Sequence, residues 1–226
     1  MNTHEISICI VNWNRSRLDI GNGKILELLP NCIKSLAEAY RDYDSELIIA
    51  DFCSTDWPLN QWLASVWTKP YSIIDCQLPF SLGMGRNNAL THVKGKIIYL
   101  IDADMIVPTD YAKITIEQIE KGFALFPLYR RQGAIDGNKN YSGAGWGNAV
   151  ITTDILQQVR NCKHDKIYPE STLWGGEDTA MVNAIRGHKI APLWREEIAG
   201  FIHQYHPKSG SYWYSQINKG NHEKSK

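Results

Sequence analysis

The sequence predicts an α/β protein with a mostly parallel sheet that is covered by helices on both faces. Short apolar runs alternate along the first half of the chain with segments whose apolar residues have helical spacing, a pattern typical of parallel sheets. Three of the runs end in polar clusters, at residues 12–15, at Asp51 and at residues 102–104. Ligands bind at the carboxyl ends of such strands, so we expect these clusters to converge on one edge of the sheet.

The elements of the first half follow from these patterns. Apolar β-rich runs predict strands at residues 6–11, 46–50, 71–76 and 96–101. Helical spacing predicts helices at residues 25–40, 58–67 and 81–92. Pro30 falls near the start of the first helix, where proline is tolerated. Ser54, Thr55 or Asp56 would cap the second helix.

The second half of the chain is less regular. Strands are predicted at residues 124–129 and 148–151, around a glycine-rich aromatic loop. A helix is predicted at residues 178–186, ending at Gly187. The last residues, 208–226, are expected to be frayed. We find no internal repeat or linker, so we expect a single compact unit.

Composition bounds the classes of function. Hydrophobic residues make up 43% and charged residues 21% of the 226 residues, as in a folded soluble protein. Lysine plus arginine and aspartate plus glutamate balance at 24 each, so no global field attracts nucleic acid. The five cysteines form no CxxC pair, which favours reduced thiols. No signal peptide or membrane-length apolar run is evident, so we expect a cytoplasmic protein, at most peripheral at a membrane.

Two acids, Asp102 and Asp104, end the apolar run that starts at residue 96. In an extended segment, residues i and i+2 point to the same side, so both carboxylates could aim at one point. Two like charges at that separation need a cation or protons to neutralise them. A divalent cation such as Mg²⁺ or Mn²⁺ would do so, and the alternative is an acidic turn without a ligand.

A second acidic pair, Glu177 and Asp178, follows Trp174, Gly175 and Gly176. The glycines allow the backbone to come close to a ligand, and acids are favoured at a helix N-terminus. The pair is therefore either a plain helix cap or a general base at the mouth of a pocket, with the tryptophan as an aromatic wall.

Two histidines in the segment FIHQYHP at residues 201–207, His203 and His206, are candidate metal ligands. Neutral imidazole binds Mn²⁺ and similar ions, and one such histidine could complete a site begun by two aspartates. A histidine taken alone is more often a surface or core residue.

Six motifs stand in order along the chain: NWNR at 12–15, ELIIADFCSTD at 46–56, GRNNA at 85–89, DAD at 102–104, WGGED at 174–178, and a late histidine. The ordered set resembles the GT-A fold glycosyltransferases, in particular family-2-like enzymes with a galactosyltransferase-type carboxyl-terminal motif. The resemblance implies an inverting transfer from a nucleotide sugar, usually a UDP-sugar, with Mn²⁺ or Mg²⁺. The acceptor would be a glycan, a lipid-linked glycan or another hydroxyl compound.

The resemblance also implies a division of the chain. A single domain, 1–226, would contain a nucleotide-sugar-binding half at 1–104, an acceptor-binding and catalytic half at 105–207, and a tail at 208–226. The residues implied to bind the nucleotide sugar are Asn12, Asn14, Arg15, Asp51, Arg86, Asp102 and Ala103. The implied metal ligands are Asp102, Asp104 and His203. Asp178 would be the catalytic base, with Glu177 helping to hold the acceptor, and the acceptor site would include Trp146, Trp174, Gly175 and Gly176.

Two departures from the family pattern affect these expectations. Cys53 stands where many relatives have glycine, which alters the loop expected to hold the nucleobase. His203, which is 25 positions after Asp178, fits the family interval better than His206. Three other functions stay open: an inactive nucleotide-sugar-binding protein on the same fold, a metal-dependent nucleotidyltransferase, and a glycosyltransferase that acts on nucleic acid, for which the chain shows no basic stripe. The second usually needs a basic glycine-rich loop near the first strand, which NWNRSR matches poorly.

Overall fold

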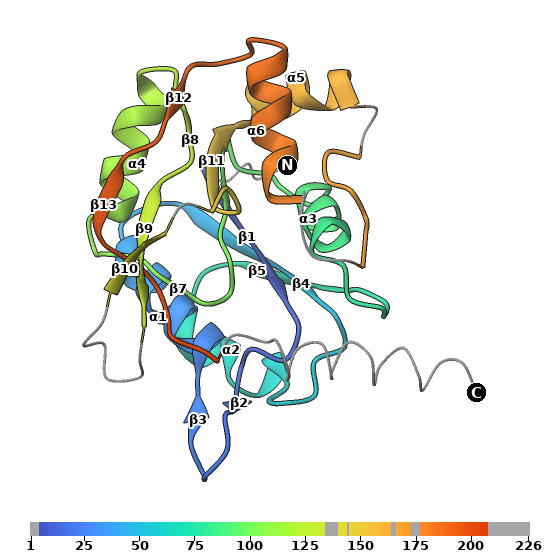
Figure 1. Ribbon diagram of the computed structural model, residues 1–226, viewed down its shortest axis with the longest axis vertical. Coiled ribbons are helices and arrows are strands. Elements are labelled where there is room, and N and C mark those ends of the chain that lie inside the picture. The colour runs from blue at the N-terminus through green and yellow to red at the C-terminus, as the bar shows by residue number, and fades with distance from the viewer. Residues whose placement is uncertain (1–4, 134–139, 144, 164–165, 173–176, 208–226) are drawn as a thin grey trace.

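The computed structural model describes residues 5–133, 140–143, 145–163, 166–172 and 177–207, around a seven-stranded sheet (Figure 1). The strands follow the order β12-β8-β11-β6-β1-β4-β5. Their bounds are β1 Ile6–Asn12, β4 Ser45–Asp51, β5 Tyr71–Asp75, β6 Ile97–Leu100, β8 Ala124–Leu125, β11 Ala149–Thr152 and β12 Leu193–Trp194. Because β1, β4, β5 and β6 are parallel, the carboxyl ends of the four strands predicted in the first half lie at one edge. The predicted α/β class is confirmed.

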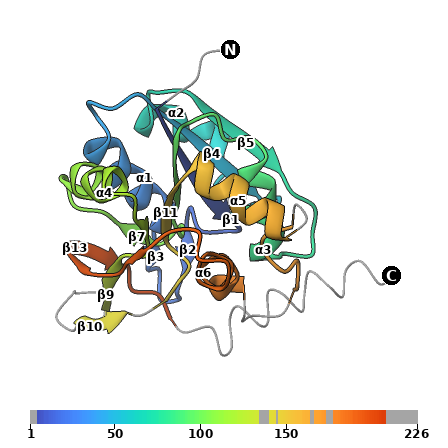
Figure 2. The same ribbon diagram turned by 90° about the horizontal axis from the view of Figure 1, so that it is seen from above.

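Helices cover both faces of this sheet (Figure 2). On one face α1 (Leu28–Ala39), α2 (Leu63–Val66) and α4 (Tyr111–Glu120) contribute to one apolar core cluster. On the other face α3 (Leu82–Leu90), α5 (Thr153–Lys163) and α6 (Glu177–Gly187) contribute to a second cluster. Side chains along β1 point alternately to the two faces of the sheet. Ile8 and Ile10 therefore pack in the first cluster and Cys9 in the second.

Two predicted helices differ from the observed ones. The first helix begins at Leu28 and not at residue 25, because β3 (Ile25–Leu26) pairs with β2 (Leu18–Asp19) in a hairpin. The predicted helix at 58–67 is a 3-10 turn, η1 (Leu59–Gln61), followed by the four-residue α2. Among the described helices, none is long and apolar enough to cross a membrane.

The predicted strand at 124–129 is two strands in different sheets. β8 ends at Leu125, and β9 (Leu128–Gln132) belongs to a second sheet. Pro127 lies between them and has no backbone N–H that could continue the ladder of hydrogen bonds. On either side of it, the Phe126 N–H donates to the carbonyl of Trp194, in β12, and the Leu128 N–H donates to the carbonyl of Glu196.

The second sheet brings the last described strand next to the segment that follows β6. Its strand order is β10-β9-β13-β7, with β7 at Met105–Ile106, β10 at Asn140–Gly143 and β13 at Glu197–His203. β13 pairs antiparallel with β7 and places His203 opposite Met105, next to Asp104. The register of β13 against β9 shifts between Glu197 and Ile202, where Gly200 has a φ of 81°.

Candidate active site

The loops after β1 and β4 are tied together by side chains. The parallel register sets Asn12 opposite Asp51. The Asn12 amide donates to the Asp51 carboxylate at 2.7 Å, and the Ser54 hydroxyl donates to the same oxygen at 2.7 Å. The Ser54 backbone N–H donates to the other oxygen at 3.0 Å. Ser54, which the sequence suggested only as a helix cap, therefore helps to orient Asp51.

The same loops need two residues in left-handed backbone conformation. Asn14 has a φ of 50°, its Oδ1 accepts the Thr55 N–H at 2.8 Å, and its own N–H donates to Ser54 at 2.9 Å. Cys53 has a φ of 51°, in the region that favours glycine. Cys53 therefore stands at a position whose backbone shape would suit glycine, the residue that the family resemblance led us to expect there.

A buried arginine joins two of the predicted acids. Arg86, on α3, is 3% exposed. Its Nη2 donates to Asp102 at 2.9 Å and its Nη1 donates to Asp178 at 2.9 Å, although the two acids are distant in sequence. The Asn148 side chain also holds Asp102, by accepting its N–H at 2.9 Å and donating to its carboxylate at 3.3 Å.

Gly147 allows this cluster to close. A Cβ atom at Gly147 would lie 2.7 Å from the Arg86 guanidinium and 3.0 Å from carboxylate oxygens of both Asp102 and Asp178. The first separation is shorter than real Cβ contacts and the other two are tighter than most, so a larger residue would displace the charged groups. The glycine-rich loop before β11 thus acts by leaving room for the charged cluster.

The cluster shifts the pKa values of its members. Burial by itself would lower the pKa of Arg86, but Asp102, Tyr168 and Asp178 outweigh it and raise that pKa above its ordinary value. Burial raises the pKa of Asp102 against the opposing effect of Arg86, and the nearby Asp178 and Asp104 add to the rise. Arg86 therefore stays charged and holds both carboxylates.

Asp104 belongs to a separate group. Its carboxylate lies 3.6 Å from His203 Nε2, 3.2 Å from His206 Nε2 and 3.8 Å from Arg15 Nη1. One donor atom each from Asp104, His203 and His206 lie within 4.8 Å of one another. Burial would raise the pKa of Asp104, yet His203, His206 and Arg15 together hold that pKa well below its usual range.

Local pairing accounts for the position of both histidines. β13 delivers His203 beside β7, and the N–H of Gln204 donates to the Asp104 carbonyl at 2.8 Å. The Gln204 side chain is anchored in turn on the Leu28 carbonyl at 2.8 Å. The chain then turns so that the rings of His203 and His206 stand 5.1 Å apart.

The two acids of the DAD motif have different partners. β6 ends at Leu100, and the Met105 N–H bonds to the Asp102 carbonyl at 3.2 Å, so the segment turns after the strand. The expectation of an extended segment through Asp104 is wrong for this reason. Asp102 faces Arg86, and Ala103 is buried between the two acids.

The predicted acceptor residues are placed only in part. Glu177, the first residue of α6, is 6% exposed, whereas the side chain of Asp178 is 41% exposed. Trp146 carries two guanidinium groups on its ring, with Arg195 at 3.4 Å and Arg186 at 4.7 Å from the ring centroid. Trp174, Gly175 and Gly176 lie outside the described residues.

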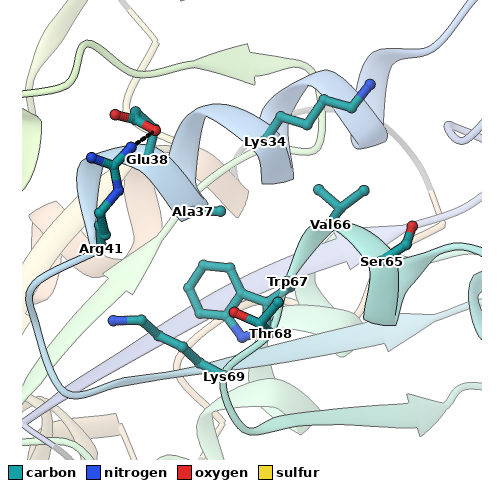
Figure 3. A pocket seen from close by; sticks show the side chains of 9 residues that line it. All are labelled: Lys34, Ala37, Glu38, Arg41, Ser65, Val66, Trp67, Thr68 and Lys69. Atoms are coloured by element: carbon teal, nitrogen blue, oxygen red, sulfur yellow. Dashed lines mark hydrogen bonds and ion pairs between the residues drawn. The ribbon is translucent and has the colours of Figure 1, made fainter.

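A cavity of about 430 Å³ lies away from these residues, between α1 and α2 (Figure 3). Lys34, Trp67 and Lys69 are among its lining residues, and none of the predicted site residues lines it. A second cavity, of about 420 Å³, adjoins the group around Asp104, because Gln204 and Tyr205 line it together with Ile106.

A mostly parallel sheet with polar loops at its carboxyl edge, and a second sheet that returns a histidine to the acid after β6, define a protein of the GT-A fold class. The chain belongs to glycosyl transferase family 2, whose model matches residues 7–172. That match ends before the WGGED motif, so the galactosyltransferase-type part of the resemblance stays an expectation.

Solved structures share the fold at low sequence identity. The TarS 1-349 structure from S. aureus has a TM-score of 0.62 and 16% identity, over 88% of this chain and 60% of that chain. The same TarS fragment in complex with UDP-GlcNAc has a TM-score of 0.64 and 14% identity, over 94% of this chain and 64% of that one. This chain thus spans less than two thirds of the TarS fragment.

A mannosyltransferase, PcManGT from Pyrobaculum calidifontis, was solved in complex with GDP-Man and Mn²⁺. It has a TM-score of 0.66 and 13% identity, over 99% of this chain and 64% of that chain. No curated protein sequence matches this chain.

Proposed function

We propose that the protein is a metal-dependent, inverting glycosyltransferase that moves a sugar from a nucleotide sugar, a UDP-sugar in the first instance, to an acceptor hydroxyl. One observation carries this proposal: Arg86 joins Asp102 to Asp178 at the same edge of the sheet where Asp104, His203 and His206 converge. A candidate donor site and a candidate base are thereby part of one charged cluster. Family membership supports the reaction class.

The donor would lie along the loops after β1 and β4. Asp51 would accept a hydrogen bond from the nucleobase, since Asn12 and Ser54 already fix its carboxylate. Asn14 and Arg15 follow on the same loop, and Arg15 stands near Asp104. Related folds were solved with UDP-GlcNAc and with GDP-Man, which supports a nucleotide-sugar donor without choosing between nucleotides.

The residues around Asp104 fit a divalent cation. Asp104, His203 and His206 supply one carboxylate and two imidazoles, a mixed donor set that suits Mn²⁺ better than Mg²⁺, which prefers oxygen ligands alone. Both histidines would bind the cation, whereas the spacing typical of the family favoured His203 alone. When bound, the cation would stabilise the charge that develops on the departing diphosphate. Asp102, whose carboxylate is held by Arg86, would lie against the ribose of the donor.

Asp178 is the better placed of the two acids for proton removal. Its carboxylate is held by Arg86 yet stays 41% exposed, so an acceptor hydroxyl can approach it. Glu177 is 6% exposed, which leaves it a supporting position at the start of α6. A base fixed on the acceptor side removes the hydroxyl proton as the oxygen attacks the anomeric carbon, opposite the leaving diphosphate.

A thermal-shift screen of nucleotide sugars with and without Mn²⁺ tests this proposal. A ligand that binds only the native state at 100 times its Kd adds about 2.7 kcal/mol of stability. That gain raises the Tm of a chain of this size by roughly 5–10 °C. We expect a UDP-sugar to give such a shift in the presence of Mn²⁺ and a smaller one with EDTA. No shift with any nucleotide sugar would overturn the proposal, and binding without transfer to any acceptor would favour the inactive alternative.

A further inference from the structure

Residues 166–172, the described segment that precedes the WGGED motif, are bonded to helix α3. Asn87, in that helix, binds the backbone of Tyr168 with both ends of its amide. Its Nδ2 donates to the Tyr168 carbonyl at 2.9 Å, and its Oδ1 accepts the Tyr168 N–H at 3.1 Å. The same Nδ2 donates to the Glu170 carboxylate at 3.2 Å. The segment is therefore fixed to α3 at Tyr168.

A glycine in α3 allows this segment to come close to the helix. Gly83 precedes Asn87 by four residues, which is about one helical turn. A Cβ atom at Gly83 would stand 1.9 Å from the carbonyl oxygen of Pro169 and 3.3 Å from the Cβ of Tyr168. No larger side chain fits there without moving the backbone of the segment. Gly83 and Asn87 together determine where Tyr168 enters the core.

The ring of Tyr168 lies against the guanidinium of Arg86. Tyr168 is 2% exposed, and Arg86 Cζ stands over its ring at 5.3 Å from the centroid. A guanidinium can present its planar face to an aromatic ring while its N–H edge bonds to carboxylates. Arg86 does both, since its Nη1 and Nη2 donate to Asp178 and Asp102. The ring therefore restricts rotation of the guanidinium out of the orientation that reaches both acids.

The charge state of Tyr168 suits a supporting ring. Burial raises the pKa of Tyr168, Arg86 opposes that rise, and Asp178 and Asp102 add to it. The phenol is therefore neutral at neutral pH. A neutral ring contacts the face of Arg86 without competing with the two carboxylates for its N–H groups.

We propose that Tyr168 is a positioning residue for the transfer reaction. Its ring fixes the plane of the Arg86 guanidinium, so that one arginine holds Asp178 on the acceptor side and Asp102 on the donor side at the same time. Asn87 places that ring by binding the backbone of Tyr168. This role in the reaction rests on the proposed glycosyltransferase function, and Tyr168 acts only through Arg86.

Arginine side-chain NMR tests the hold of Tyr168 on Arg86 without any substrate. Rotation about the Nε–Cζ bond exchanges the two Nη signals of a guanidinium, and the Arg86 signals are identified by their loss in Arg86→Lys. Tyr168→Leu removes the ring, and the lost contact predicts about tenfold faster exchange. Tyr168→Phe keeps the ring and should exchange at the wild-type rate. Equal exchange rates in Tyr168→Leu and the wild type would overturn the proposal.

Two further variants control for the loss of core packing. Tyr111, at the start of α4, is buried in the first core cluster, whereas Tyr168 belongs to the second. Tyr111→Leu should leave the Arg86 exchange rate unchanged, and faster exchange there as well would overturn the proposal. Where Tyr168→Leu gives no native spectrum, Asn87→Ser decides, since its shorter side chain cannot bond to both backbone groups of Tyr168. Exchange at the wild-type rate in Asn87→Ser would then overturn the proposal.

Kinetics with the donor found by thermal shift test the role in turnover. Asp102 is held by Asn148 as well as by Arg86, so the KM for the donor should change by less than about twofold in Tyr168→Leu. Asp178 is held by Arg86, so kcat should fall by about tenfold or more as the carboxylate loses its fixed orientation. Tyr168→Phe should restore kcat. An unchanged kcat in Tyr168→Leu, or no rescue by phenylalanine, would overturn the positioning role.

The NMR and kinetic measurements distinguish failure of this inference from failure of the proposed function. If no nucleotide sugar binds while the exchange rates differ as expected, the proposed function is overturned and the contact of Tyr168 with Arg86 is only structural. If the donor is turned over and the Arg86 exchange rate does not depend on the ring, the proposed function stands and the positioning role is overturned.

Discussion

Single residues carry most of the chemistry proposed for this protein, and Arg86 connects them. The sequence motif placed Arg86 near the diphosphate of the donor. In the structure its two nitrogens are engaged by Asp102 and Asp178. Burial of the charged Arg86 side chain costs free energy unless fixed carboxylates compensate it. We therefore expect Arg86, Asp102 and Asp178 to act as a unit.

Asp178→Asn tests the proposed base. The amide keeps the size of the side chain and an oxygen that accepts from Arg86, so we expect little change in donor affinity. Sugar transfer should fall by about 100-fold or more, since the amide cannot take the proton. Asp154→Asn, in the first turn of α5, is the matched control. Full transfer activity in Asp178→Asn would reject the assignment.

Gly147→Ala tests the packing of the cluster. The added methyl would meet Arg86, Asp102 and Asp178 at 2.7 to 3.0 Å, so we expect transfer to fall steeply while the fold is kept. Gly187→Ala is the control, because a Cβ there has no neighbour within 4 Å. Activity and urea unfolding of the two variants are compared. Equal activity in both would show that the cluster tolerates displacement.

At the scale of elements, the second sheet sets the histidines against Asp104. We expect His203→Ala and His206→Ala each to raise the Mn²⁺ concentration needed for nucleotide-sugar binding by about tenfold or more. His188→Ala, an exposed histidine after α6, should have no effect. Calorimetric titration with Mn²⁺ checks this. An effect confined to one of the two variants would reduce the proposed ligand set to that histidine and Asp104.

Strands and polar strand ends were predictable because both depend on local pattern. The runs at residues 6–11 and 46–50 are buried strands, and their ends meet because parallel pairing sets Asn12 opposite Asp51. Helix α4 was not predicted. Its ten residues include Tyr111, Ile116 and Ile119 among five apolar ones, and Asp110 precedes it, so a local signal for this helix is present in the sequence.

The site was predictable by residue type and less so by partner. Spacing alone could pair Asp102 with Asp104, but the turn after β6 sends their side chains to Arg86 and to the histidines. Choosing between His203 and His206 required the register of β13 and the turn after it, neither of which is visible in a linear sequence. The contact of Arg86 with Asp178 is likewise a product of tertiary structure.

At the scale of the whole molecule, the two halves of the chain share their cores. β6, from the first half, pairs with β11, from the second, and the core cluster that holds Leu36 and Ile49 also holds Tyr129 and Phe201. We therefore expect residues 1–226 to unfold as one domain, in a single cooperative transition. Circular dichroism and tryptophan fluorescence should give coincident thermal curves. Two separated transitions would contradict the single domain.

The irregular register of β13 has a consequence for how this chain can vary between relatives. Glu197 pairs with Leu128, and Ile202 pairs with Arg130. Between these two pairs β13 therefore contains more residues than β9, and the additional residues have no partner in the regular register. An insertion or deletion near Gly200 can be absorbed there without moving His203. The same change after residue 202 would slip the pairing with β7 and turn the histidine to the opposite face of the sheet. Homologues of this chain should therefore differ in length before Ile202 and keep a constant count from Ile202 to His206.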